Sequence, residues 1–134
     1  MKTLALVFAL LLVTAACEDD SRAVDPIWGK QACAHCAMLV SDPHFAAELT
    51  TTAGDRFFFD DPGCMAAYVH DRAPQVRKMW VRDQAGVWVD AANAHFEKGA
   101  SSPMDYGFMT NAAGHEDWAA VVRTATERTK RGGP

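Results

Sequence analysis

Three cysteines, one histidine and two methionines lie in the two short motifs that begin and end the segment 33–65. The segment opens with Cys33-Ala34-His35-Cys36-Ala37-Met38 and closes with Asp60-Asp61-Pro62-Gly63-Cys64-Met65. Thiolate and thioether sulfur are soft donors, and soft donors favour Cu(I) over hard cations. The residue types and their spacing therefore predict a soft-metal site in this segment.

The number of cysteines favours metal binding over a disulfide framework. The chain has four cysteines. If Cys17 carries lipid, as argued below, Cys33, Cys36 and Cys64 remain, and three thiols cannot all pair within one chain. One disulfide beside one buried, inert cysteine is the alternative, because free cysteine is among the most buried residue types.

The Cys33-x-x-Cys36 pair is compatible with two further kinds of site. A structural zinc site needs four closed ligands, and Asp60 is the residue that could complete three cysteines. A thiol oxidoreductase needs its first cysteine at a helix N-terminus, which lowers the thiol pKa. The residues after Cys36 instead indicate an extended segment, so a redox pair is the less favoured of the two alternatives.

The N-terminus has the pattern of an export signal. Lys2 is followed by an uncharged apolar run over 3–16, which is typical of a signal peptide and too short to span a bilayer comfortably. The run ends in Val13-Thr14-Ala15-Ala16-Cys17, which resembles the lipobox of bacterial lipoproteins. We therefore expect residues 1–16 to be a signal peptide, and residues 17–26 to be a tether with lipid on Cys17.

The remaining chain is predicted to form one α+β domain over 27–134. Of its 134 residues, 49% are hydrophobic and 22% charged, as in ordinary globular proteins, and a net charge of −4 gives no basic surface for nucleic acid. Residue alternation and turn residues predict strands over 37–40, 46–52, 56–59, 76–81 and 86–89, and a last strand after the loop 102–109. Capping signals predict helices over 62–72, 90–96 and 116–130.

Two features of this arrangement bear on the site. The halves over about 33–75 and 76–130 repeat weakly, each as ββα followed by a strand, so we expect two small ββαβ modules packed together plus a C-terminal helix. Asp61 is expected to cap the helix over 62–72. Cys64 and Met65 then lie in its first turn, where the helix dipole favours a thiolate.

Four motifs together resemble the nitrous oxide reductase accessory protein family, NosL. They are Cys33-Ala34-His35-Cys36-Ala37-Met38-Leu39-Val40, Phe58-Phe59-Asp60-Asp61-Pro62-Gly63-Cys64-Met65, Trp88-Val89-Asp90-Ala91 and Pro103-Met104-Asp105-Tyr106-Gly107. The resemblance implies an outward-facing lipoprotein that binds one Cu(I) and supports copper-site assembly in the periplasmic reductase. It also implies a NosL-like pair of ββαβ modules. The first half further resembles treble-clef-like metal modules, with Asp60 where those often have cysteine. Ala37 stands where the family commonly has glycine.

These observations lead us to expect a copper carrier and not an enzyme, since no catalytic triad order or phosphate loop is present. The expected metal ligands are Cys64, Met38, Met65 and Met104, followed by Cys33, Cys36 and His35. The expected partners are nitrous oxide reductase or its copper-assembly machinery, and the membrane through the lipid anchor. The expected location is the cell envelope, facing the periplasm. A membrane-tethered structural zinc module and, less favoured, a thiol oxidoreductase remain the alternatives.

Overall fold

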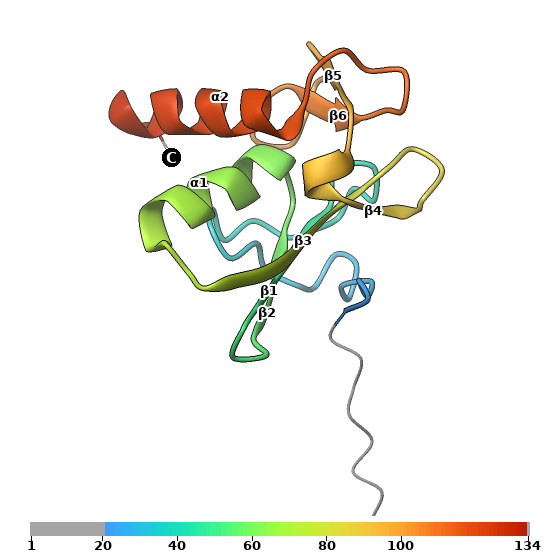
Figure 1. Cartoon of the computed structure of the whole chain (residues 1–134), viewed down its shortest axis with the longest axis vertical. Coiled ribbons are helices and arrows are strands. Elements are labelled where there is room, and N and C mark those ends of the chain that lie inside the picture. Colours follow the sequence, from blue (N-terminus) through green and yellow to red (C-terminus); the bar gives the residue numbers. More distant parts are fainter. Residues whose placement is uncertain (1–20, 134) are drawn as a thin grey trace, which may run out of the picture.

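A four-stranded antiparallel sheet forms the base of the fold (Figure 1). In the computed structural model, which describes residues 21–133, its strands are β1 (Ala47–Thr51), β2 (Arg56–Phe59), β3 (Val76–Arg82) and β4 (Trp88–Asp90). Their order is β2-β1-β3-β4. All five residues of the central strand β1 are buried. Its side chains alternate between the two faces of the sheet, so both faces are covered at this strand.

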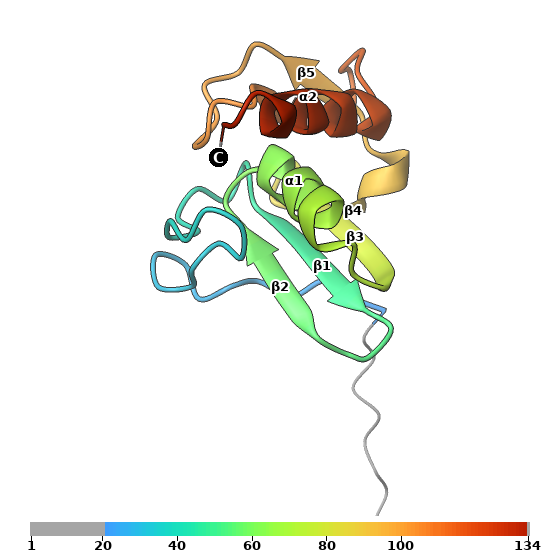
Figure 2. The ribbon, with the colours of Figure 1, turned by 90° about the vertical axis from the view of Figure 1, so that its left-hand side faces the viewer.

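Helix α1 (Pro62–Arg72) joins β2 to β3 and lies on one face of the sheet, and helix α2 (Trp118–Lys130) packs on α1 (Figure 2). The capping side chain of α1 is Asp61, which accepts a 2.8 Å hydrogen bond from the Gly63 N–H. Proline follows at the first helical position, and the helix ends at Ala73, which has a left-handed backbone. The core lies between the sheet and the helices, where Leu49, Phe59 and Met65 are fully buried.

A second, two-stranded sheet lies beside α2. It pairs β5 (Phe96–Lys98) with β6 (Phe108–Thr110), and the 3₁₀ helix η1 (Ala91–Asn93) connects β4 to β5. The ring of Phe96 lies 6.2 Å from the ring centroids of both Phe108 and Trp118. These aromatic contacts hold the small sheet against the start of α2.

The structure confirms the predicted α+β class with a C-terminal helix. The helix over 62–72 and the strand over 56–59 form as predicted, and β3 and β4 are the expected pair of adjacent strands. The first half contains the order β1-β2-α1-β3, but β4 belongs to the same sheet and η1 is a single turn. The division into two ββαβ modules is therefore not confirmed.

Two predicted elements are wrong. Residues 37–40 form no strand; Leu39 makes only an isolated bridge with Ala32, because the preceding residues turn back on themselves. The predicted helix over 90–96 stops after η1, and Phe96 instead begins β5. The main chain of Phe96 exchanges hydrogen bonds with that of Glu116, so pairing with a distant residue overrides the local helix signal.

The expected signal peptide over 1–16 and the lipid site at Cys17 lie outside the described residues. Within the expected tether, residues 22–25 make contacts with the sheet, including a 2.8 Å hydrogen bond from the Val24 N–H to Glu48. Across residues 21–133, none of the helices has the length and apolar character needed to cross a bilayer.

The contact between α1 and the 102–107 loop generates a first prediction. A Cβ added at Gly63 would lie 2.0 Å from the Tyr106 ring, and Tyr106 is itself buried. We expect Gly63→Ala to lower the free energy of unfolding by about 1–3 kcal/mol through overpacking. Chemical denaturation measures this change.

Ala73→Gly, at the other end of α1, is the matched control, for which we expect no decrease in the free energy of unfolding. Ala73 has a φ of 45°, a left-handed conformation that glycine adopts without a Cβ clash. This variant should be at least as stable as the native chain. A Gly63→Ala protein as stable as the native one would contradict the packing described here.

Candidate metal centre

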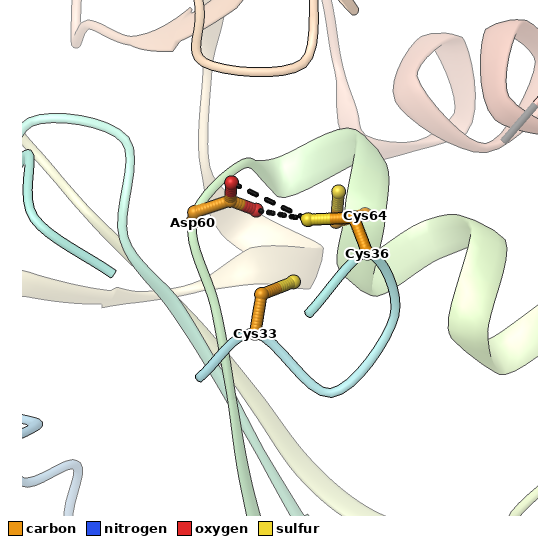
Figure 3. Close-up of side chains that lie close together, drawn as sticks. All are labelled: Cys33, Cys36, Asp60 and Cys64. Carbon is orange, nitrogen blue, oxygen red and sulfur yellow. Dashed lines mark hydrogen bonds between the residues drawn. The ribbon is translucent and has the colours of Figure 1, made fainter. Parts of the chain in front are cut away.

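Four side chains meet at one end of the large sheet (Figure 3). They are the thiols of Cys33, Cys36 and Cys64 and the carboxylate of Asp60, whose potential ligand atoms all lie within 4.8 Å of one another. The three cysteines are free thiols. Sulfur and carboxylate donors at this separation can hold a metal ion, so the site is a candidate metal centre.

A tight loop presents Cys33 and Cys36. The Cys33 N–H donates to the Met38 carbonyl at 2.7 Å, and the Ala37 N–H donates to the Cys33 carbonyl at 3.0 Å. The loop is attached to β2 by a 2.9 Å hydrogen bond from the Ala34 N–H to the Phe58 carbonyl. Ala37 has a φ of 65°, which costs an alanine about 1–2 kcal/mol relative to glycine. The glycine common here in the NosL family would avoid that cost.

The junction between β2 and α1 presents the other two side chains. Asp60 directly follows β2, and Cys64 lies in the first turn of α1; both are buried. Between them, the buried carboxylate of Asp61 also accepts hydrogen bonds from the Ser102 hydroxyl at 2.6 Å and the Met104 N–H at 3.1 Å. Burial raises the pKa of Asp61. The 102–107 loop therefore fixes the helix end that carries Cys64.

The four side chains interact in two pairs. The Cys36 thiol donates to both carboxylate oxygens of Asp60 at 3.4 Å. The neighbouring Cys64 thiol lowers the pKa of Cys33 to about 7 against the opposing effect of burial. The contact with Cys33, followed by burial, raises the pKa of Cys64, and burial raises that of Cys36 to about 12.

The position of the thiolate differs from the sequence-based expectation. Cys64 does lie in the first turn of α1, but the nearby Cys33 thiol and burial raise its pKa. The same contact lowers the pKa of Cys33, so Cys33, in the loop, is the thiol that ionises most readily. A cysteine that ionises while buried beside two other thiols is suited to holding a thiophilic ion.

The predicted ligands fall into two groups. Cys33, Cys36 and Cys64 lie together, whereas His35 is outside the group of His, Cys, Asp and Glu side chains that converge. Met38 is 53% exposed, Met65 is fully buried in the core, and Met104 packs partly buried against the core. Thioether ligation stays a prediction. Asp60 joins the three cysteines; the sequence signal for it is its position in the treble-clef-like pattern, where it suits a zinc site.

Comparison of the chain with protein-family models, curated proteins and solved structures returned no match. The candidate site therefore stands on its own geometry, which supports binding of a metal ion at Cys33, Cys36, Asp60 and Cys64.

The thiol pKa values predict how metal binding depends on pH. At pH 8 Cys33 is largely ionised, while Cys36 and Cys64 still carry protons. An ion that binds all three sulfurs as thiolates should release about two protons, so its affinity should rise about a hundredfold per pH unit. Below pH 7, where Cys33 is also protonated, the dependence should become steeper.

Calorimetric titration with Zn(II) in buffers of different ionisation heat measures the protons released, and repetition between pH 6 and pH 8 measures the slope. Zinc serves here as a redox-inactive probe of the thiols. Binding without proton release would show that the cysteines are not the ligands.

Proposed function

We propose that this protein is a metallochaperone that binds Cu(I) and delivers it for assembly of the copper centre of nitrous oxide reductase. The observation that carries the proposal is the meeting of three free thiols within 4.8 Å of one another. Thiolate is the donor class that Cu(I) prefers. The resemblance of the four motifs to the NosL family supports the reductase as the destination of the copper.

The exposure of the cluster supports a carrier. Cys33 and Cys64 are buried, whereas Cys36 is half-buried and is followed by the exposed residues Ala37 and Met38. A receiving protein can approach the ion from this edge and replace its ligands one at a time. In this proposal, the exposed thioether of Met38 adds a soft donor at the exit side.

The size of the core also supports a carrier, because a carrier must stay folded after it has delivered its metal. The buried core extends from the sheet through α1 to α2 and includes Leu49, Phe96 and Val121, which lie outside the cluster. Small modules that depend on a metal for folding lack such a core. We therefore expect the metal-free chain to be folded.

The cellular parts of the proposal rest on the N-terminal sequence. A signal peptide over 1–16 and lipid on Cys17 make this a periplasm-facing lipoprotein of the cell envelope. Its partners are then the reductase itself or the copper-assembly machinery of the membrane and periplasm. The activity proposed is binding and delivery, without catalysis.

A structural zinc module is the second candidate function. The observation in its favour is Asp60, which completes a closed set of four donors of the kind that structural zinc sites use. The two candidates differ in how much they need this carboxylate. Tetrahedral zinc requires a fourth ligand, whereas three thiolates suffice for Cu(I).

Asp60→Asn separates these candidates. We expect it to lower Zn(II) affinity by about 10–100-fold, because zinc loses either a direct ligand or the carboxylate that hydrogen-bonds to its Cys36 ligand. Cu(I) affinity should stay within about threefold, because thiolate sulfur supplies its bonds. Competition titrations with a Cu(I) chelator and a Zn(II) chelator measure both affinities on the same preparation.

Asp71→Asn is the matched control, since it removes the same charge from an exposed position on α1. It should change neither affinity. Weak Cu(I) binding, together with unfolding when a chelator removes zinc, would contradict the carrier and favour the structural module.

A further inference from the structure

The face of the large sheet that points away from α1 is rich in tryptophan. Alternation along β3 places Trp80 and Arg82 on the same face as Glu48, which lies opposite Trp80 in the strand pairing. Trp88 lies opposite Arg82 on the neighbouring strand. The Arg82 guanidinium is 4.9 Å from the ring centroid of Trp28 and 5.8 Å from that of Trp88. Three of the four tryptophans in the chain thus share this outer face.

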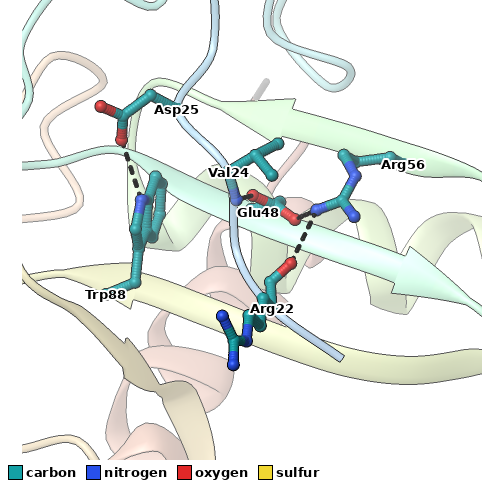
Figure 4. Close-up of polar contacts among 6 residues, drawn as sticks. All are labelled: Arg22, Val24, Asp25, Glu48, Arg56 and Trp88. Atoms are coloured by element: carbon teal, nitrogen blue, oxygen red, sulfur yellow. Dashed lines mark hydrogen bonds and ion pairs between the residues drawn. The ribbon is translucent and has the colours of Figure 1, made fainter. Parts of the chain in front are cut away.

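The N-terminal segment crosses this same face (Figure 4). The Val24 N–H donates to the buried carboxylate of Glu48, which also pairs with Arg56 on β2. The next residue, Asp25, accepts a 2.9 Å hydrogen bond from the indole N–H of Trp88 and lies 3.7 Å from Arg82. These contacts hold residues 22–25 across the strands, so the chain enters the folded body at the outer face.

Exposed aliphatic side chains lie around the tryptophans. Val24 is 45% exposed and Ile27 66%. Val24 belongs to the segment that crosses the face, and Ile27 directly precedes Trp28. Aromatic rings with a polar indole N–H, next to exposed aliphatic side chains, are typical of surfaces at a membrane–water interface.

The lipid site proposed above places this face next to a bilayer. Ser21, where the described chain begins, is four residue steps along the chain from Cys17. A fully extended chain spans at most about 3.6 Å per residue, so Ser21 lies within about 14 Å of an acylated Cys17. The lipid anchor therefore keeps the folded domain close to the lipid headgroups, with the outer face of the sheet on the side of the anchor.

We propose that the outer face, defined by Val24, Ile27, Trp28, Trp80 and Trp88, rests on the lipid surface of the membrane. This inference relies on the proposed lipid anchor at Cys17. The contact is mainly apolar, because the cations of this face are paired: Lys78 lies 2.9 Å from Asp90, and Arg82 is near Asp25. It therefore does not require anionic lipid.

Quenching of tryptophan fluorescence by brominated phosphatidylcholine tests the proposal. The full chain with its acylated N-terminus is reconstituted into phosphatidylcholine vesicles, and its emission is compared with and without brominated acyl chains. We expect clear quenching in the native chain and a decrease of at least about twofold in Val24→Glu/Ile27→Glu, which places charge at the interface. Both substitutions are at exposed positions, so the fold is retained.

Val122→Glu is the matched control, since Val122 is an exposed valine on α2, on the other side of the molecule. Its quenching should equal that of the native chain. Equal quenching in the native chain and Val24→Glu/Ile27→Glu, or no quenching in either, would overturn the proposal. Self-association of the native chain through this face, without quenching, would also overturn it.

Sedimentation with vesicles and the intact mass of the mature chain separate this proposal from the one on which it relies. If the mature chain carries no acyl groups and does not sediment with vesicles, the lipid anchor is contradicted, and so is the membrane contact of the outer face that relies on it. If an acylated chain sediments but shows no quenching, only the membrane contact of the outer face is contradicted. Cu(I) binding is measured independently of both.

Discussion

The junction between β2 and α1 is the constraint on which the metal centre depends. Asp60 ends the strand and Cys64 begins the helix, so the turn capped by Asp61 sets their separation. The Cys33–Cys36 loop reaches them only because the Ala34 N–H is bonded to β2. The 102–107 loop fixes the same turn from the other side through Ser102. Contacts from three distant parts of the chain thus bring three thiols and a carboxylate together.

The metal cluster lies at one end of the buried core. Cys33 and Cys64 belong to this core, which continues between the sheet and its helices. The opposite face of the sheet is occupied by the N-terminal segment and the tryptophans. A carrier built this way can exchange its metal at the edge near Cys36 while the outer face stays on the membrane. The carrier and membrane roles remain proposals, and each has its own test.

Local signals account for what the sequence predicted well. Asp61 followed by Pro62 marks the start of α1, and the structure has the helix over the predicted residues. The strand predicted over 37–40 fails because a tight turn after Cys33 brings Leu39 back to Ala32. The helix predicted over 90–96 fails because Phe96 pairs with the distant Glu116. The three cysteines could be named as candidate ligands because their residue type limits their chemistry, but the sequence does not say which ligands act together. Asp60 could not be named as a ligand with the same weight as the cysteines, since an aspartate before a helix can serve several roles. Only its hydrogen bond with Cys36 in the structure shows that its carboxylate joins the cluster.

The measurement that tests the central claim most directly is X-ray absorption spectroscopy at the copper edge of the Cu(I)-loaded protein. Our account predicts a first shell of about three sulfur atoms, since thiolates are the donors that Cu(I) prefers, and the loss of one sulfur in Cys64→Ser. Exchange of Cys64 for serine keeps the size of the side chain and replaces only the donor atom. A first shell of nitrogen or oxygen atoms, or a spectrum unchanged in Cys64→Ser, would contradict binding of copper at this cluster.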